Sequence, residues 1–128
     1  MKMFKYLFTC FVILIFISCD QNQKTKDSTG LFPIRQNGKR GYIDKTGKIV
    51  INPEFDDGGS FSEGLAWVNI GGKLNEHGGV KGGKYGYIDK TGNIVINPQF
   101  DVAGDFSDGL AIVSGGGSMA LSIRLGRL

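Results

Sequence analysis

Short apolar runs alternate with polar turns from Leu31 to Val113, and the same order of runs occurs twice. Residues 38–68 and 83–113 align without gaps and are identical at 23 of 31 positions. Both copies contain Gly-Tyr-Ile-Asp-Lys-Thr-Gly, then Ile-Val-Ile-Asn-Pro-x-Phe-Asp, then Phe-Ser-(Glu/Asp)-Gly-Leu-Ala-x-Val. Runs this short, bounded by turn residues, are typical of strands. A repeat of this length predicts an array of small supersecondary units.

Each unit contains three apolar runs, so the sequence predicts an all-β array of short antiparallel three-stranded units. The predicted units span about residues 30–64 and 65–109, and a third begins at 110 within a repeat region of 30–117. Asp44–Gly47 and Asp89–Gly92 lie between the second and third runs, where a turn ending in Gly favours a hairpin. We expect no helix longer than about two turns in the repeats.

The residues between these runs give three further expectations. Pro53 and Pro98 should end the third strand of each unit, because proline lacks the N–H donor. Four phenylalanines should fill the core between neighbouring units: Phe55, Phe61, Phe100 and Phe106. The glycine-rich insert at 69–82 should be a mobile loop on the rim of the array.

A different pattern precedes the repeats. Lys2 and Lys5 are followed by an apolar run over 6–17, which predicts a helical export signal at 1–18. The run ends in Phe-Ile-Ser-Cys19, which resembles a bacterial lipobox, although Phe16 replaces the usual Leu. That resemblance implies lipidation of Cys19 and a protein held in the bacterial cell envelope. A plain signal peptide or an uncleaved anchor is the alternative. The polar residues at 19–29 should form a tether.

Composition narrows the classes of function. The net charge of +3 falls to +1 without residues 1–18, and no basic cluster remains, so nucleic-acid binding is not expected. Both cysteines, Cys10 and Cys19, lie before the repeats, which therefore lack a disulfide framework. At 128 residues the chain has room for one small domain.

No catalytic constellation is found in the sequence, and we expect no cofactor and no metal site. Asp101, Asp105 and Asp108 lack the spacing of a calcium loop and are better explained as turn caps. His77, the sole histidine, has no second metal ligand or nucleophile near it in sequence. The weak binding candidates are aromatic: a carbohydrate or peptide platform would use Tyr42, Trp67, Tyr85 and Tyr87. Aromatic residues repeated at fixed offsets are more typical of a core.

The repeated residues resemble the WG (KWG) repeat family of bacterial proteins, whose units have a Lys-Trp-Gly-Tyr-Ile-Asp-Lys-x-Gly signature. The resemblance covers residues 31–113. Arg40 and Tyr85 stand where the family prefers Trp, and Arg40 places the packing of the first unit in question. The family implies β-structured repeat arrays, often exported or lipid-anchored, with a role in interactions and without established chemistry.

The repeat stops after Gly117. Permitted codons for 117–128, with one adenine restored after the first, encode Gly-Lys-Tyr-Gly-Phe-Ile-Asp-Lys-Thr-Gly-Lys-Ile. Nine of the eleven residues after Gly then equal those of Lys84–Ile94. We therefore interpret 118–128 as an out-of-frame tail. An ordinary evolved terminus is the alternative. The last apolar run is then either exposed or covered only by residues 119–128, which have Leu121, Ile123 and Leu125 at strand-like alternation.

Two classes of function fit these patterns. The first is a non-enzymatic binding or scaffold module, held in the envelope through a lipid on Cys19 and recognising a protein or a cell-wall polymer. The second is a truncated fragment of a longer repeat protein, whose enzymatic or binding activity lies beyond residue 117.

Overall fold

The computed structural model describes residues 30–124 and 126, with backbone only for 118–121. All its regular structure is β, which confirms the predicted fold class. The predicted signal segment at 1–18 and the whole tether at 19–29, Cys19 included, lie outside the described residues. The strands are β1 (Phe32–Gln36), β2 (Lys39–Ile43), β3 (Ile49–Phe55), β4 (Asp57–Gly58), β5 (Ala66–Leu74), β6 (Val80–Ile88), β7 (Ile94–Phe100), β8 (Val102–Ala103), β9 (Leu110–Gly115) and β10 (Ser118–Arg124).

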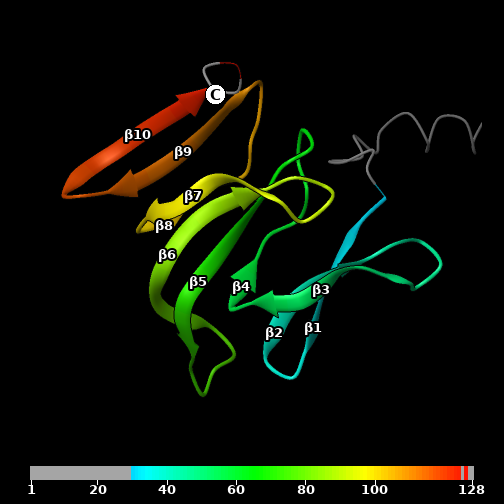
Figure 1. Cartoon of the computed structure of the whole chain (residues 1–128). Helices are drawn as coiled ribbons and strands as arrows, with labels where there is room; N and C mark the ends of the chain where they lie inside the picture. Colours follow the sequence, from blue (N-terminus) through cyan, green and yellow to red (C-terminus); the bar gives the residue numbers. More distant parts are fainter. Residues whose placement is uncertain (1–29, 125, 127–128) are drawn as a thin grey trace, which may run out of the picture.

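Three small antiparallel sheets follow one another along the chain (Figure 1). Their strand orders are β1-β2-β3, β4-β5-β6-β7 and β8-β9-β10. The second and third sheets each begin with a two-residue strand that the sequence pattern did not predict. β4 pairs with β5, and β8 pairs with β9. Each of these strands comes from the return segment of the preceding unit, so successive units are joined by backbone hydrogen bonds as well as by side chains.

The predicted hairpin turns are confirmed. In the first, the amide of Gly47 donates to the carbonyl of Asp44 at 3.1 Å, and the amide of Asp44 donates to the carbonyl of Lys48 at 2.9 Å. The Asp44 carboxylate also accepts from the Thr46 amide at 2.8 Å and from the Thr46 hydroxyl at 2.6 Å. The turn at Asp89 repeats this arrangement. A short polar side chain that satisfies the turn amides is the reason that Asp begins both turns.

The expectation that proline ends the third strand is wrong. β3 continues through Pro53 to Phe55, and β7 continues through Pro98 to Phe100. Both are edge strands of their sheets, where a missing N–H donor is tolerated. The register of each also shifts opposite the preceding strand, which marks a β-bulge close to the proline.

The prediction of a mobile loop at 69–82 is also wrong. These residues extend β5 and β6 into a long hairpin that projects from the second sheet (Figure 1). Its turn copies the Asp44 turn, because the Asn75 carboxamide oxygen accepts from the amides of His77 at 3.0 Å and Gly79 at 2.9 Å. Asn69 is buried and stabilises the base, since its amide group donates to the carbonyl of Gly82 at 3.1 Å.

The hydrophobic core lies between neighbouring units. The first cluster joins the first two sheets: Tyr42, Ile51, Phe55, Phe61, Ala66, Val68 and Ile88. The second cluster joins the last two sheets: Leu65, Tyr87, Ile96, Phe106, Ala111 and Val113. The predicted role of the phenylalanines is confirmed, with Phe100 only partly buried at the edge of the second cluster. Each unit therefore buries its apolar surface against its neighbour, as in a repeat array.

Candidate functional site

Two of the four aromatic binding candidates, Tyr42 and Tyr87, belong to the core. Both side chains are fully buried. The Tyr42 hydroxyl donates to the carbonyl of Gly59 at 2.7 Å, and the Tyr87 hydroxyl donates to that of Gly104 at 2.7 Å. Burial, helped by the Asp105 charge, raises the pKa of Tyr87 to about 12. Because neither ring reaches the surface, the platform interpretation is wrong for these two residues.

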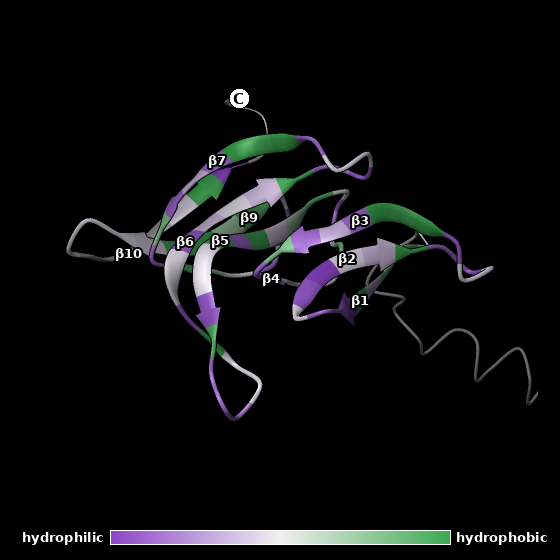
Figure 2. Cartoon of the chain, turned by 60° about the horizontal axis from the view of Figure 1, so that its bottom comes forward, coloured by the Kyte–Doolittle hydropathy of each residue, from purple (hydrophilic) through white to green (hydrophobic). Residues whose placement is uncertain are grey.

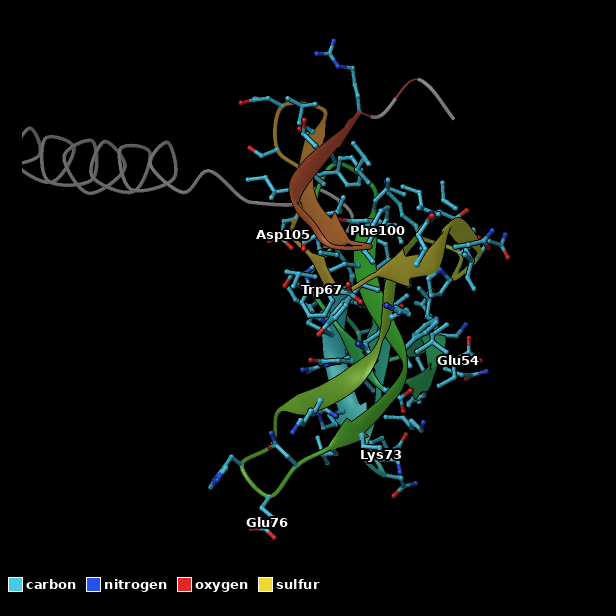
Figure 3. The ribbon with its side chains drawn as sticks, turned by 90° about the vertical axis from the view of Figure 1, so that its left-hand side faces the viewer. Glu54, Trp67, Lys73, Glu76, Phe100 and Asp105 are labelled. Atoms are coloured by element: carbon cyan, nitrogen blue, oxygen red, sulfur yellow. The ribbon has the colours of Figure 1, made fainter. Side chains whose placement is uncertain are left out.

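The other two candidates, Trp67 and Tyr85, form a half-buried pair across β5 and β6. Their rings meet edge to face, with centroids 5.6 Å apart. The indole N–H of Trp67 donates to the Asp105 carboxylate at 3.0 Å, and Figure 3 shows these two residues close together near Phe100. A Cβ on Gly59 would lie 2.3 Å from the Trp67 indole nitrogen, so this glycine leaves room for the ring. The contact between Trp67 and Asp105 could not be read from the sequence, because 38 positions separate them.

The first unit lacks this aromatic pair: Pro33 stands at the position of Trp67, and a charged residue stands at that of Tyr85. Arg40 stands at the position of Tyr85, and its guanidinium contacts the Asp57 carboxylate at 3.2 Å. Arg35 contacts the same carboxylate at 2.9 Å and also donates to the carbonyl of Gly38. Asp57 therefore accommodates Arg40, which answers the question that the sequence raised about the first unit. The Arg40 Nε is buried without a hydrogen-bond partner, so the replacement of the aromatic residue by Arg40 lowers the stability of the first unit.

The feature that both complete units present to solvent is an apolar pair at the start of an edge strand. Ile49 and Val50 in β3 are 40% and 45% exposed, and Ile94 and Val95 in β7 are 45% and 40% exposed. Figure 2 shows these hydrophobic segments on the same side of the molecule. The pairs are 45 positions apart in sequence, so the repeat presents one surface twice.

An ion pair is repeated in the same way. Lys39 contacts Asp56 in the first unit, and Lys84 contacts Asp101 in the second. The Lys84 ammonium holds the pKa of Asp101 below its ordinary value. Each ion pair lies beyond the end of its edge strand, at the opposite end from the apolar pair.

Within residues 30–124 and 126, no three His, Cys, Asp or Glu side chains lie close enough to hold a metal ion. Asp101 and Asp105 have the partners described above, and the exposed His77 lies in the Asn75 turn. The same part of the chain contains no helix long and apolar enough to cross a membrane.

A family profile described as "WG containing repeat" matches residues 41–73 and 85–117, together slightly more than half of the 128 residues. The chain belongs to the WG-repeat family. Comparisons with curated proteins and with solved structures gave no significant match. The signature glycine of the WG repeat is explained by the bulged strand beside it: a Cβ on Gly86 would lie 2.4 Å from the carbonyl oxygen of Ile96, and one on Gly41 would lie 2.6 Å from that of Ile51.

Proposed function

We propose that this WG-repeat protein is a non-enzymatic binding module, held in the bacterial cell envelope, that recognises an extended protein or cell-wall polymer. The observation that carries the proposal is the exposed apolar pair that β3 and β7 both present, Ile49–Val50 and Ile94–Val95. Both strands are sheet edges, which can pair with an added chain or contact a polymer along its length.

An extended partner suits this surface better than a small molecule does. Two equivalent sites on one rigid array bind a partner that itself repeats or extends, and the second contact is then intramolecular. The polar side chains with shifted pKa values or buried partners are already engaged within the fold, which leaves the edge strands as the candidate surface. Tyr42 and Tyr87 serve the core, and Asp105 is engaged by Trp67.

Binding to isolated peptidoglycan sacculi tests the polymer as partner. The full chain is cosedimented with sacculi, alongside Val50→Asp, Val95→Asp and the double variant. Two sites on one chain bind a polymer more tightly than one site does, so we expect either single change to lower the affinity about 100-fold. The double change should abolish binding. Leu74→Asp is the matched control, because Leu74 is 48% exposed at the far end of the β5–β6 hairpin.

Failure of the wild-type chain to bind sacculi would reject the cell-wall polymer. Photo-crosslinking from position 95 in intact cells then tests a protein partner in the envelope. Equal loss of binding in Leu74→Asp and Val95→Asp would reject the edge strands as the site.

Anchoring in the envelope rests on the lipobox-like sequence that ends at Cys19. We expect Cys19→Ala to release the protein from the membrane fraction and to block its lipid-dependent processing, because acyl chains on Cys19 provide the attachment. Cys10→Ala is the control and should leave both unchanged. Unaltered membrane attachment of Cys19→Ala would show that residues 1–18 act as an uncleaved anchor, whereas a wild-type chain already free of the membrane would indicate a plain signal peptide.

The alternative remains that the activity belongs to a longer product that continues beyond residue 117. It is supported by the match of the recoded tail to Lys84–Ile94. Sequencing the DNA downstream separates the two proposals. Further repeats favour the binding array, and an appended domain with a catalytic motif favours an enzyme.

A further inference from the structure

The packing between units shows what covers each face of a WG unit. In the second unit, Ala66, Val68 and Ile88 face the first unit and are almost completely buried in the first cluster. Leu65 of the same unit faces the third unit, in the second cluster, and Trp67 packs there as well. A unit thus has two different faces, and each is covered by the opposite face of a neighbour.

The first unit presents one of these faces without a preceding neighbour among the described residues. Phe32 pairs with Ile43 as Ala66 pairs with Ile88, and Ile34 lies opposite Gly41 as Val68 lies opposite Gly86. We name Phe32, Ile34 and Ile43 the N-terminal face. Phe32 is 51% exposed, and both isoleucines are partly exposed, whereas their equivalents in the second unit are buried.

The third unit presents the other face. Leu110 and Ile112 occupy the positions of Leu65 and Trp67, and they are 37% and 69% exposed. Ser122 lies opposite Ile112 as Tyr87 lies opposite Trp67, so it occupies the position of the tyrosine. We name Leu110, Ile112 and Ser122 the C-terminal face. The opposite side of the β8-β9-β10 sheet is covered by the second unit, since Ile123 packs against the second cluster.

Each terminal face differs in side-chain size from the equivalent face of the second unit, and the two differences are of opposite sign. The N-terminal face has the large ring of Phe32 where the second unit has Ala66. The C-terminal face has the small Ser122 where the second unit has Tyr87. A ring gained on one surface and a ring lost from the other preserve the volume between them, and such exchanges are well tolerated in a core.

We propose that the C-terminal face of one copy of this chain packs on the N-terminal face of a second copy, in the way that successive units pack within the chain. The contact is heterologous, so a pair of copies still has one free face of each kind, and association continues into rods or closes into a ring. The internal unit interfaces identify the occupant, because the same type of face is covered there by another WG unit. This inference does not depend on the proposed partner or on the lipid anchor.

Sedimentation velocity of the full chain in detergent, over a range of concentrations, tests the proposal. The wild-type chain should form oligomers whose size grows with concentration. Phe32→Asp removes the N-terminal face and Ile112→Asp removes the C-terminal face. Each variant alone should be monomeric, with association weakened at least about 100-fold, because the new carboxylate would be buried without a partner.

Mixing the two variants is the decisive step. Phe32→Asp keeps an intact C-terminal face and Ile112→Asp keeps an intact N-terminal face. The mixture should therefore form a 1:1 dimer and nothing larger. A misfolded variant could not complement the other, so recovery of the dimer also shows that both are folded. Val95→Asp is the control on an edge strand and should associate like the wild-type chain.

Three results would overturn the proposal. A wild-type chain that stays monomeric at all concentrations would show that the two faces do not meet. Two variants that fail to combine would exclude a heterologous contact. Loss of association in Val95→Asp would assign it to the edge strands.

Discussion

At the scale of single residues, one aspartate in each repeat holds its hairpin turn together. Asp44 and Asp89 each accept three hydrogen bonds through one carboxylate oxygen: from the amide and hydroxyl of a threonine two residues on, and from the amide four residues on. The threonine hydroxyl is the main reason that the pKa of each carboxyl lies below its ordinary value.

These lowered pKa values predict how stability depends on pH. A lowered folded-state pKa stabilises the fold above the unfolded-state value of about 3.9, and the stabilisation is lost as the pH falls through the folded-state pKa. We expect the free energy of unfolding to decrease below about pH 4. The double variant Asp44→Asn/Asp89→Asn should show a shallower decrease, because a carboxamide accepts hydrogen bonds without titrating.

Urea unfolding between pH 2 and 6 measures this difference. Thr46→Val/Thr91→Val is the matched variant, since it keeps both carboxylates and removes the hydroxyl bonds. Its decrease should begin at the same pH as in the wild-type chain but be smaller and end at a higher pH, because the folded-state pKa values lie closer to the unfolded-state value. Identical pH profiles for the wild-type chain and the Asn variant would show that these turns do not set the acid stability.

At the scale of elements, the repeat is built around a glycine beside a bulged edge strand. Gly41 and Gly86 lie where the register of the hairpin shifts. Backbone atoms of the neighbouring strand approach so closely that a side chain has no space. The bulge in turn lets each edge strand pass its proline and deliver Phe55 or Phe100 to the core.

We expect Gly86→Ala to destabilise the protein by about 3 kcal/mol, because the new methyl group collides with backbone that cannot move aside without breaking the sheet. The measurement is the free energy of unfolding in urea. Gly115→Ala is the control: Gly115 also lies in a strand, but its nearest neighbours would be 3.4 Å from a Cβ. Equal effects of the two changes would assign the loss to general glycine propensity.

The hairpins whose turns have a characteristic local sequence could be predicted. The features that depend on contacts between distant residues could not. The Asp44 and Asp89 turns could be read from Asp and Gly at fixed spacing. Asn75 and Gly78 have the same spacing, and that signal would have revealed the third hairpin. Pro53 was misjudged because its position on an edge strand depends on the sheet order, which no local pattern contains. The core roles of Tyr42 and Tyr87 followed from their repetition, whereas the pairing of Trp67 with Asp105 did not.

At the scale of the whole molecule, stability comes from contacts between units, so an array with few units has little of it. Repeat arrays need about three units to bury a continuous core. The third sheet here has β10 as the partner of β9, as the alternation of its residues predicted. Its register shifts between Ser118 and Leu121, which places Leu121 opposite Val113, at the position that Gly86 occupies opposite Val68. β10 thus completes a hairpin without the residues of the WG signature.

The last prediction replaces residues 118–124 by Lys-Tyr-Gly-Phe-Ile-Asp-Lys, the residues that the restored reading frame encodes. The replacement returns Gly beside Val113 and an aromatic ring to the position that Ser122 now occupies, without the register shift. Because the replacement removes the register shift and restores the regular backbone pairing opposite Val113, the free energy of unfolding should rise by about 1 kcal/mol and the melting temperature by about 5 °C. Thermal unfolding of the two forms from Gly30 onward, at concentrations where both are monomeric, measures the change. The same seven residues in shuffled order should give no rise. Equal midpoints for the natural and replaced forms would show that β10 is a genuine cap, because a cap evolved for this position gains nothing from the repeat sequence.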